Sequence, residues 1–284
     1  MKFGVQNNID RICRKLRAFL YGLYPNRAMP LIPSKRPIDI IIPLVEKDLD
    51  IFPLCLESIR HNVLNVIKNI YIVAPDNARI KEFCSNNGLM FIDENVVLGY
   101  SAKDLDYVTF SGVDRNGWLF QQYIKLSGNV GTCDDFVTID SDHILLEPHV
   151  FITDDNRYVF YRSCEFHLGY YLINNRLLGK LKIPALSFVA HKMVFNKKHL
   201  SELKSKIKDY TGMEWVRAIL ANLDRNDTSA FSEFEIYASS MPKELYVSVL
   251  WNQLQLKRSE LISYDELKKK YVGFLSVTFP EYFT

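Results

Sequence analysis

The sequence predicts an α/β fold in which a layered sheet is flanked by helices. Short apolar, β-branched runs are typical of parallel strands buried on both faces, and they occur at residues 38–44, 69–74, 89–92 and 136–139. Segments with helical apolar spacing lie between them, at residues 54–66, 78–87 and 116–127. This alternation implies right-handed crossovers, and such sheets bind ligands beyond the carboxyl ends of their strands. We therefore expect chemistry in the loops that follow Pro43, Ala74, Ile92 and Ile139.

The second half of the chain has a mixed pattern. Strands are predicted at residues 158–162 and 187–195, and helices at residues 199–210, 213–223 and 264–271. Because neither a repeat nor a second linker interrupts it, residues 38–284 are predicted to form a single domain.

Composition narrows the class of protein. Of 284 residues 48% are hydrophobic, and the net charge is +2, which excludes a disordered chain and argues against a general nucleic-acid binder. The five cysteines are odd in number, widely spaced and without zinc-site spacing. We interpret them as reduced thiols in a cytoplasmic protein.

The first 36 residues differ from the rest. They hold eight cations and one anion, a charge of +7, whereas the remaining chain has 27 cations and 32 anions, a charge of −5. Apolar residues at helical spacing over residues 9–24, with cations between them, predict an amphipathic helix that ends before Pro25. Residues 25–37, with four prolines, are predicted to be an irregular linker. The helix fits either an anionic membrane surface or the protein's own core, and we expect no transmembrane segment or export signal.

The strongest chemical signal follows the strand at residues 136–139. Asp140 and Asp142 flank Ser141, and alternate residues of an extended segment point the same way, so the two carboxylates can converge on one cation. Mg²⁺ and similar hard ions prefer one or two carboxylates together with substrate phosphates. The alternative is an Asp-rich turn that caps the next element.

At these residues the sequence resembles the GT-A-type glycosyltransferases. The first strand reads IDIIIPLVEKD, and the DxD motif lies in TIDSDHILLEP. The chain is similar to bacterial surface-polysaccharide (lipopolysaccharide or capsule) glycosyltransferases, in which an Arg-x-Gly-Trp helix with a Gln pair precedes the DxD strand and a Ser-Glu-aromatic-Glu-x-Tyr segment follows it. Here these segments are residues 115–125 and 232–237. The resemblance covers about residues 38–240.

The resemblance implies a GT-A-like, Rossmann-type mixed sheet and a metal-dependent hexosyltransferase-like enzyme. Residues 38–142 would bind a nucleotide-diphosphate-sugar donor, and residues 143–284 would bind the acceptor. Mn²⁺ or Mg²⁺ would bridge Asp140 and Asp142 to the diphosphate. By position alone, Pro43 with the loop to Asp48, and Asp76, would lie near the base and ribose, beside Ser141. The acceptor would be a bacterial surface glycan or glycolipid at the inner face of the cytoplasmic membrane.

Inverting transfer also needs a base for the acceptor hydroxyl. Glu233 and Glu235 are the candidates, with Glu233 preferred, on a helix that Thr228 or Ser229 could cap. The alternative is that both glutamates only complement the helix dipole. A retaining enzyme would not need this base, and stereochemistry stays open.

The acceptor side is predicted from polar and aromatic residues. Trp118, Gln121, Gln122 and Lys125 would share one helix face, and flat rings and amides suit hydroxyl-rich ligands. The alternative is a core Trp with solvated neighbours. His191 interrupts an apolar strand, where a polar ring needs a partner, so it could bind a ligand or simply be a hydrogen-bonded core residue.

Missing motifs exclude several classes. The chain has no GxGxxG after the first strand, no P-loop and no GxSxG, and its first-strand loop lacks the glycines of a pyrophosphorylase. The alternative function is a non-catalytic carbohydrate- or nucleotide-binding module of the same fold. A third interpretation is a phosphodiester nuclease that uses the paired aspartates. Such an enzyme usually needs further carboxylates close to the pair and a basic groove for its substrate.

Overall fold

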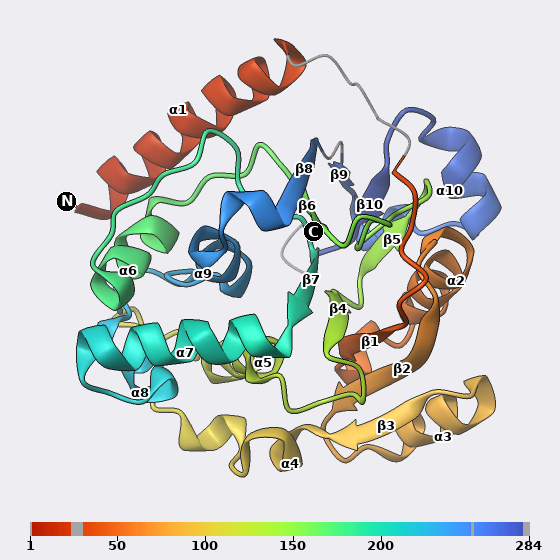
Figure 1. The fold of residues 1–284 in the computed structure, drawn as a ribbon, viewed down its shortest axis with the longest axis horizontal. Helices are drawn as coiled ribbons and strands as arrows, with labels where there is room; N and C mark the ends of the chain where they lie inside the picture. Colours follow the sequence, from red (N-terminus) through yellow and green to blue (C-terminus); the bar gives the residue numbers. More distant parts are fainter. Residues whose placement is uncertain (1, 24–30, 251–252, 281–284) are drawn as a thin grey trace.

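The structure is a computed structural model that describes residues 2–23, 31–250 and 253–280. Its central sheet has the strand order β3-β2-β1-β4-β7 (Figure 1), in which β7 alone runs antiparallel to its neighbour. These strands are β1 (Ile38–Pro43), β2 (Ile67–Ala74), β3 (Met90–Asp93), β4 (Asp135–Ile139) and β7 (Lys192–Asn196). The predicted α/β fold with a mixed sheet flanked by helices is confirmed.

Two smaller sheets complete the second half of the chain. One pairs β5 (His143–Leu145), β10 (Ser276–Thr278) and β9 (Gln253–Gln255), and the other pairs β6 (Tyr158–Arg162) with β8 (Tyr246–Leu250). The sequence predicted β6 but none of the other four, because they are short or only half-buried and lack a long apolar run.

Helices gather on both sides of the central sheet. In Figure 1, α2, α3 and α10 lie on the side of β1 and β2, and α5 to α9 lie on the side of β7. Their bounds are α2 (Phe52–Asn62), α3 (Ala78–Asn87), α4 (Glu94–Leu98), α5 (Asn116–Ser127), α6 (Leu168–Leu178), α7 (Lys197–Thr211), α8 (Trp215–Asn222), α9 (Glu233–Ser240) and α10 (Tyr264–Lys270). The predicted helices at residues 78–87 and 116–127 agree to the residue, and Gly88, at φ 66°, ends the first of them as expected.

One predicted strand is wrong over half its length. Residues 187–191 are not in a strand, and β7 begins only at Lys192. His191 has a backbone φ of 59°, in the left-handed region that a non-glycine residue rarely adopts, so an extended strand cannot pass through it.

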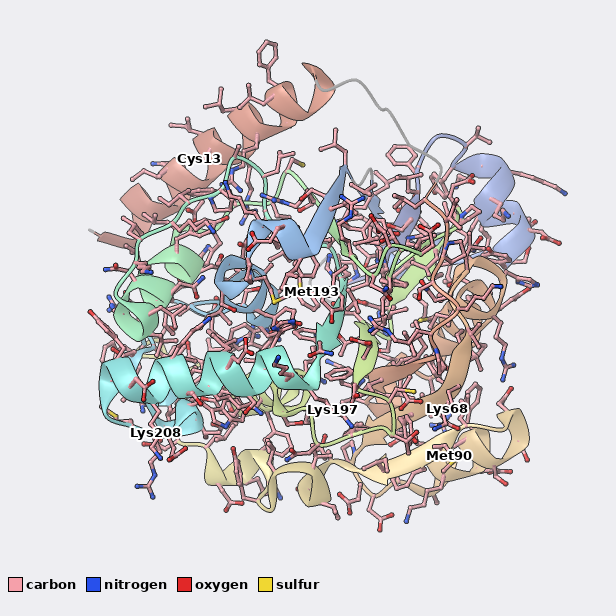
Figure 2. The ribbon with its side chains drawn as sticks, viewed as in Figure 1. Cys13, Lys68, Met90, Met193, Lys197 and Lys208 are labelled. Atoms are coloured by element: carbon pink, nitrogen blue, oxygen red, sulfur yellow. The ribbon has the colours of Figure 1, made fainter. Side chains whose placement is uncertain are left out.

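The amphipathic leader helix is confirmed as α1 (Lys2–Leu23), which lies on the outside of the molecule near α6 (Figure 1). Cys13 on α1 and Met90 on β3 mark opposite ends of the molecule in Figure 2. Of the predicted linker, residues 24–30 lie outside the described residues, and residues 31–37 include a bridge from Pro33 to Thr153. Within the described ranges, no helix is long and apolar enough to cross a bilayer.

Candidate functional site

A cleft of about 1500 Å³ opens at the carboxyl ends of the parallel strands. The segment after each of these strands contributes to its lining, with Val45 after β1, Pro75 after β2, Glu94 after β3 and Asp140 after β4. The strand order changes direction between β1 and β4, and such a switch point is where open α/β sheets bind ligands. A cleft therefore lies where the sequence analysis expects the chemistry.

Most of the predicted site residues meet in this cleft. Those that line it are Pro43, Trp118, Gln121, Gln122, Lys125, Asp140, Ser141, Asp142, His191 and Glu233. Two do not line it. Asp76 follows β2 but its side chain is 65% exposed and pairs with Lys81, since the chain turns outward there into α3. Glu235 is fully buried elsewhere.

Asp140 and Asp142 are carried by a turn and not by an extended strand. β4 ends at Ile139, and the backbone N–H of His143 donates to the Asp140 carbonyl at 3.0 Å to close the turn. The Asp140 N–H donates to the His191 carbonyl at 3.0 Å, which fixes the turn to the start of β7. The two carboxylates still reach the same cleft, although the expected reason, strand alternation, was wrong.

Asp140 is neutralised within the protein. Lys125 Nζ, on α5, lies 2.7 Å from Asp140 Oδ1 and 2.8 Å from Glu233 Oε1 on α9, and its side chain is 5% exposed. Burial raises the pKa of Asp140, but the Lys125 charge and the hydrogen bond from His191 outweigh it and hold this pKa well below its usual range. Burial lowers the pKa of Lys125, and the two carboxylates raise it further than burial lowers it. Lys125, predicted to bind acceptor, is thus an ionic bridge between Asp140 and Glu233.

Asp142 has the opposite environment. Among the described residues its carboxylate forms no salt bridge, and it accepts a hydrogen bond from the Thr278 hydroxyl at 3.5 Å. Burial and then the charge of Asp140 raise the pKa of Asp142 to about 6. The cleft therefore contains a partly buried carboxylate that has no salt bridge within the described part of the chain.

His191 carries two signs of a functional residue. Its left-handed backbone is strained, and such strain persists where the surrounding structure enforces it, often at sites of function. Its Nδ1 lies 3.0 Å from Asp140 Oδ2, while its buried Nε2 has no hydrogen-bond partner among the described residues. Burial lowers the pKa of His191, and Asp140 raises it by more.

These residues fit a divalent cation in charge and in chemistry. No group of three or more His, Cys, Asp or Glu side chains in the described part of the chain is arranged as a ready metal site. However, a hard divalent ion needs only one or two carboxylates when substrate phosphates complete its ligands, and the carboxylates of Asp140 and Asp142 both line the cleft. A cation bound there would relieve the repulsion between the two aspartates.

Helix α9 separates the two glutamates. Residues two apart on a helix point about 200° away from each other, so Glu233 and Glu235 cannot face the same side. Glu233 lines the cleft, and in the amide orientation that satisfies both groups Gln122 donates to it. Burial raises the pKa of Glu233, although Lys125 lowers it in part. The helix cap is Ser232, whose hydroxyl accepts from the Glu235 N–H, and not Thr228 or Ser229 as predicted.

Glu235 forms hydrogen bonds in the interior of the protein. Its Oε1 accepts hydrogen bonds from the Ser187 hydroxyl at 2.5 Å, the Phe188 N–H at 2.9 Å and the Tyr171 hydroxyl at 3.2 Å. Burial raises the pKa of this carboxyl. The contacts give Glu235 a structural role on the face of α9 that turns away from the cleft.

The predicted face of α5 is confirmed as one wall of the cleft. Trp118, Gln121, Gln122 and Lys125 recur every three or four residues, so they share a side of the helix. The Arg115 guanidinium lies 4.5 Å from the centre of the Trp118 ring. The Trp118 ring and the amides of Gln121 and Gln122 thus form a surface that extends toward Glu233.

Several cleft residues were not predicted. Arg258 pairs with Asp48, whose other carboxylate oxygen accepts from Ser141, so a cation from beyond the resemblance stands next to the DxD turn. Arg11 and Lys15 of α1 also line the cleft. No local pattern could reveal these, because the fold brings them from sequence-distant segments.

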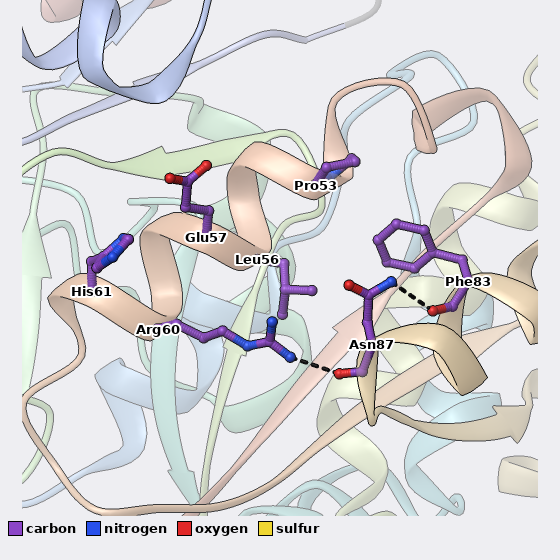
Figure 3. Close-up of a pocket in the computed structure, with 7 residues that line it drawn as sticks. All are labelled: Pro53, Leu56, Glu57, Arg60, His61, Phe83 and Asn87. Carbon is purple, nitrogen blue, oxygen red and sulfur yellow. Dashed lines mark hydrogen bonds between the residues drawn. The ribbon is translucent and has the colours of Figure 1, made fainter.

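A second, smaller depression of about 370 Å³ lies between α2 and α3 (Figure 3). The Arg60 guanidinium donates to the Asn87 carbonyl across it at 2.7 Å, and Pro53 and Leu56 supply apolar lining. None of the predicted donor or acceptor residues lines it, so the site remains the large cleft.

Comparison with known proteins identifies a sequence family for the chain and distant similarities to solved structures. No curated protein matches the chain. Mouse xyloside xylosyltransferase 1 is 11% identical with a TM-score of 0.45, over 87% of this chain and 99% of that one. The galactosyltransferase LgtC is 10% identical with a TM-score of 0.43, over 85% and 87% of the two chains. Residues 35–264, most of the chain, match the model of a family of unknown function, DUF6492, and the protein therefore belongs to that family.

Proposed function

We propose that the protein is a metal-dependent glycosyltransferase that moves a sugar from a nucleotide-diphosphate donor to a bacterial surface glycan or glycolipid. The observation that carries this proposal is the pair Asp140 and Asp142 at the β1/β4 switch point, one carboxylate neutralised by Lys125 and the other not. The motif resemblance, with its Gln pair and Ser-Glu segment now on the walls of the same cleft, supports it.

Asp140 and Asp142, together with the diphosphate oxygens of the donor, would hold Mn²⁺ or Mg²⁺. The bound ion would neutralise the negative charge that develops on the departing diphosphate. Arg258 and Lys47, at the same end of the cleft, would add positive charge near the phosphates. The loop from Pro43 to Asp48 would take the nucleoside.

Glu233 would act as the base in an inverting transfer. The acceptor oxygen bonds to the anomeric carbon, the bond from that carbon to the diphosphate oxygen breaks, and the acceptor proton passes to Glu233. Burial raises the pKa of Glu233, which favours proton uptake, and Lys125 stays paired with Asp140 when Glu233 becomes neutral. Trp118 and Gln121 would hold the acceptor sugar.

The test is release of free nucleotide from a panel of nucleotide sugars with Mn²⁺, with and without glycan acceptors. The wild type should release nucleotide from at least one donor, and Asp140→Ala should not. A donor-dependent rise in melting temperature with no nucleotide release from any donor would contradict the proposal and establish the non-catalytic binding module instead.

A further inference from the structure

Helix α1 is attached to the body through its charged side. Arg17 donates to the Glu165 carbonyl at 2.7 Å and the Pro184 carbonyl at 2.5 Å, and it is 5% exposed. Arg14 donates to the Phe166 carbonyl at 2.8 Å. Asp10 pairs with His167 at 2.8 Å. A soluble helix normally buries its apolar stripe, and α1 does the reverse.

The apolar side of α1 faces outward as a result. Ile12 is 66% exposed, Leu16 57% and Phe19 64%, and Ile9 and Leu20 extend the same row. From Ile9 to Leu20 the row runs about 16 Å along the helix. A continuous exposed apolar row of this kind marks an interaction surface.

Charge selects the partner. Arg11 and Lys15 are exposed and lie along one side of the apolar row. The other two cations of this stretch, Arg14 and Arg17, instead donate hydrogen bonds to backbone carbonyls of the protein body. An apolar row edged by exposed cations is the arrangement of helices that lie in the headgroup region of anionic bilayers. A protein groove for the same helix would need acidic residues at its edge and would not depend on lipid.

The helix also borders the cleft. Arg11, Arg14 and Lys15 belong to its lining, while Ile12, Leu16 and Phe19 do not. A bilayer that takes up the apolar row would therefore lie beside the cleft opening, on the side where α1 runs.

We propose that α1 lies flat on an anionic phospholipid bilayer with Ile12, Leu16 and Phe19 in the headgroup boundary, and that the cleft thereby receives an acceptor anchored in that bilayer. The lipid contact depends only on α1, and the acceptor class rests on the proposed function. Because Asp10, Arg14 and Arg17 hold the opposite side of the helix, binding needs no rotation of α1.

Vesicle sedimentation tests the lipid contact. The full chain should sediment with vesicles of phosphatidylcholine mixed with phosphatidylglycerol, and weakly with phosphatidylcholine alone or at high salt. The partition coefficient of the triple variant Ile12→Ser/Leu16→Ser/Phe19→Ser onto the mixed vesicles should be at least roughly tenfold lower than that of the wild type. A matched control, Met90→Ser/Val96→Ser/Val272→Ser, removes three exposed apolar side chains away from α1 and should bind as the wild type does.

Three outcomes would overturn the lipid contact: equal binding of the α1 variant, no binding by the wild type, or a wild-type dimer in light scattering that the α1 variant abolishes. The last would assign the row to a second copy of the chain. Melting temperatures of both variants should equal that of the wild type, since all six side chains are exposed.

Activity separates this inference from the proposed function. Nucleotide release from a soluble donor should be the same in the α1 variant, whereas transfer to a glycolipid in vesicles should fall together with sedimentation. Unchanged transfer to the glycolipid would overturn the acceptor class. Absence of any nucleotide release by the wild type would contradict the proposed function and leave the vesicle result standing.

Discussion

Asp140 and Asp142 are two residues apart and line the same cleft, yet the surroundings of their carboxylates differ in charge balance. On the Asp140 side, Lys125 bridges two carboxylates within 2.8 Å. Around Asp142, a partly buried carboxylate has no salt bridge among the described residues, and desolvation and the charge of Asp140 raise its pKa to about 6. The difference shows that the protein itself balances the charge of Asp140, and under the proposed function we expect a bound cation to balance that of Asp142.

The largest effect should come from Asp142→Asn. Loss of a cation ligand at the diphosphate should lower transfer by roughly a thousandfold or more. The same change removes a repelled charge, so the metal-free melting temperature at pH 8 should rise. The sign follows from the raised pKa, since the folded state holds more protons than the unfolded state between about pH 4 and 6 and stability falls as pH rises through that range. Asp76→Asn, at an exposed position, should change neither quantity.

Substitution of Glu233 and substitution of Glu235 should have different effects on kcat. Glu233→Gln removes the proton acceptor and should lower kcat about 10²- to 10⁴-fold with little change in donor binding. Glu235→Gln keeps an oxygen for its three donors and should leave kcat within a few-fold of the wild type. A normal kcat in Glu233→Gln with a large loss in Glu235→Gln would reverse the assignment.

Lys125→Met should be a stability variant. Removing the ammonium leaves the buried Glu233 and the partly buried Asp140 without their shared cation, which should cost about 3–5 kcal/mol at pH 7 and less in acid, where Glu233 gains a proton. Lys204→Met is the matched control, because Lys204 donates to one neutral carbonyl, that of Ser127, and its loss should cost about 1 kcal/mol. Chemical denaturation measures both.

The smallest effect concerns α1. Burial lowers the pKa of His167, but Asp227 and then Asp10 raise it by more. The protonated ring therefore stabilises the folded state fully below about pH 6.5, and this contribution is lost as pH rises through the raised pKa. Amide exchange in α1 should speed up with pH beyond its intrinsic dependence in the wild type and less so in Asp10→Asn. Equal pH dependence would mean that His167 does not hold the helix.

The first half of the fold was predictable because its strands are buried on both faces. All six residues of β1 are buried, and such strands appear in the sequence as apolar runs with clear ends. α6 was missed because its apolar residues surround the helix without a stripe, so periodicity gave no signal.

The site was predictable in its residue types more than in its contacts. The DxD turn and the α5 face followed from sequence, but the bridge from Lys125 to Glu233 joins residues 108 positions apart and has no local signature. The orientation of α1 was equally hidden, since the anchors of Arg17 are backbone carbonyls, which any residue supplies.

The most direct test is calorimetric titration of uridine diphosphate, and then of the other nucleoside diphosphates, into wild type and Asp142→Asn with and without Mn²⁺ at pH 7.5. We predict that Mn²⁺ strengthens binding of at least one nucleotide to the wild type and has no effect on the variant. Binding that is indifferent to Mn²⁺ in the wild type, or equally strengthened in the variant, would contradict the account.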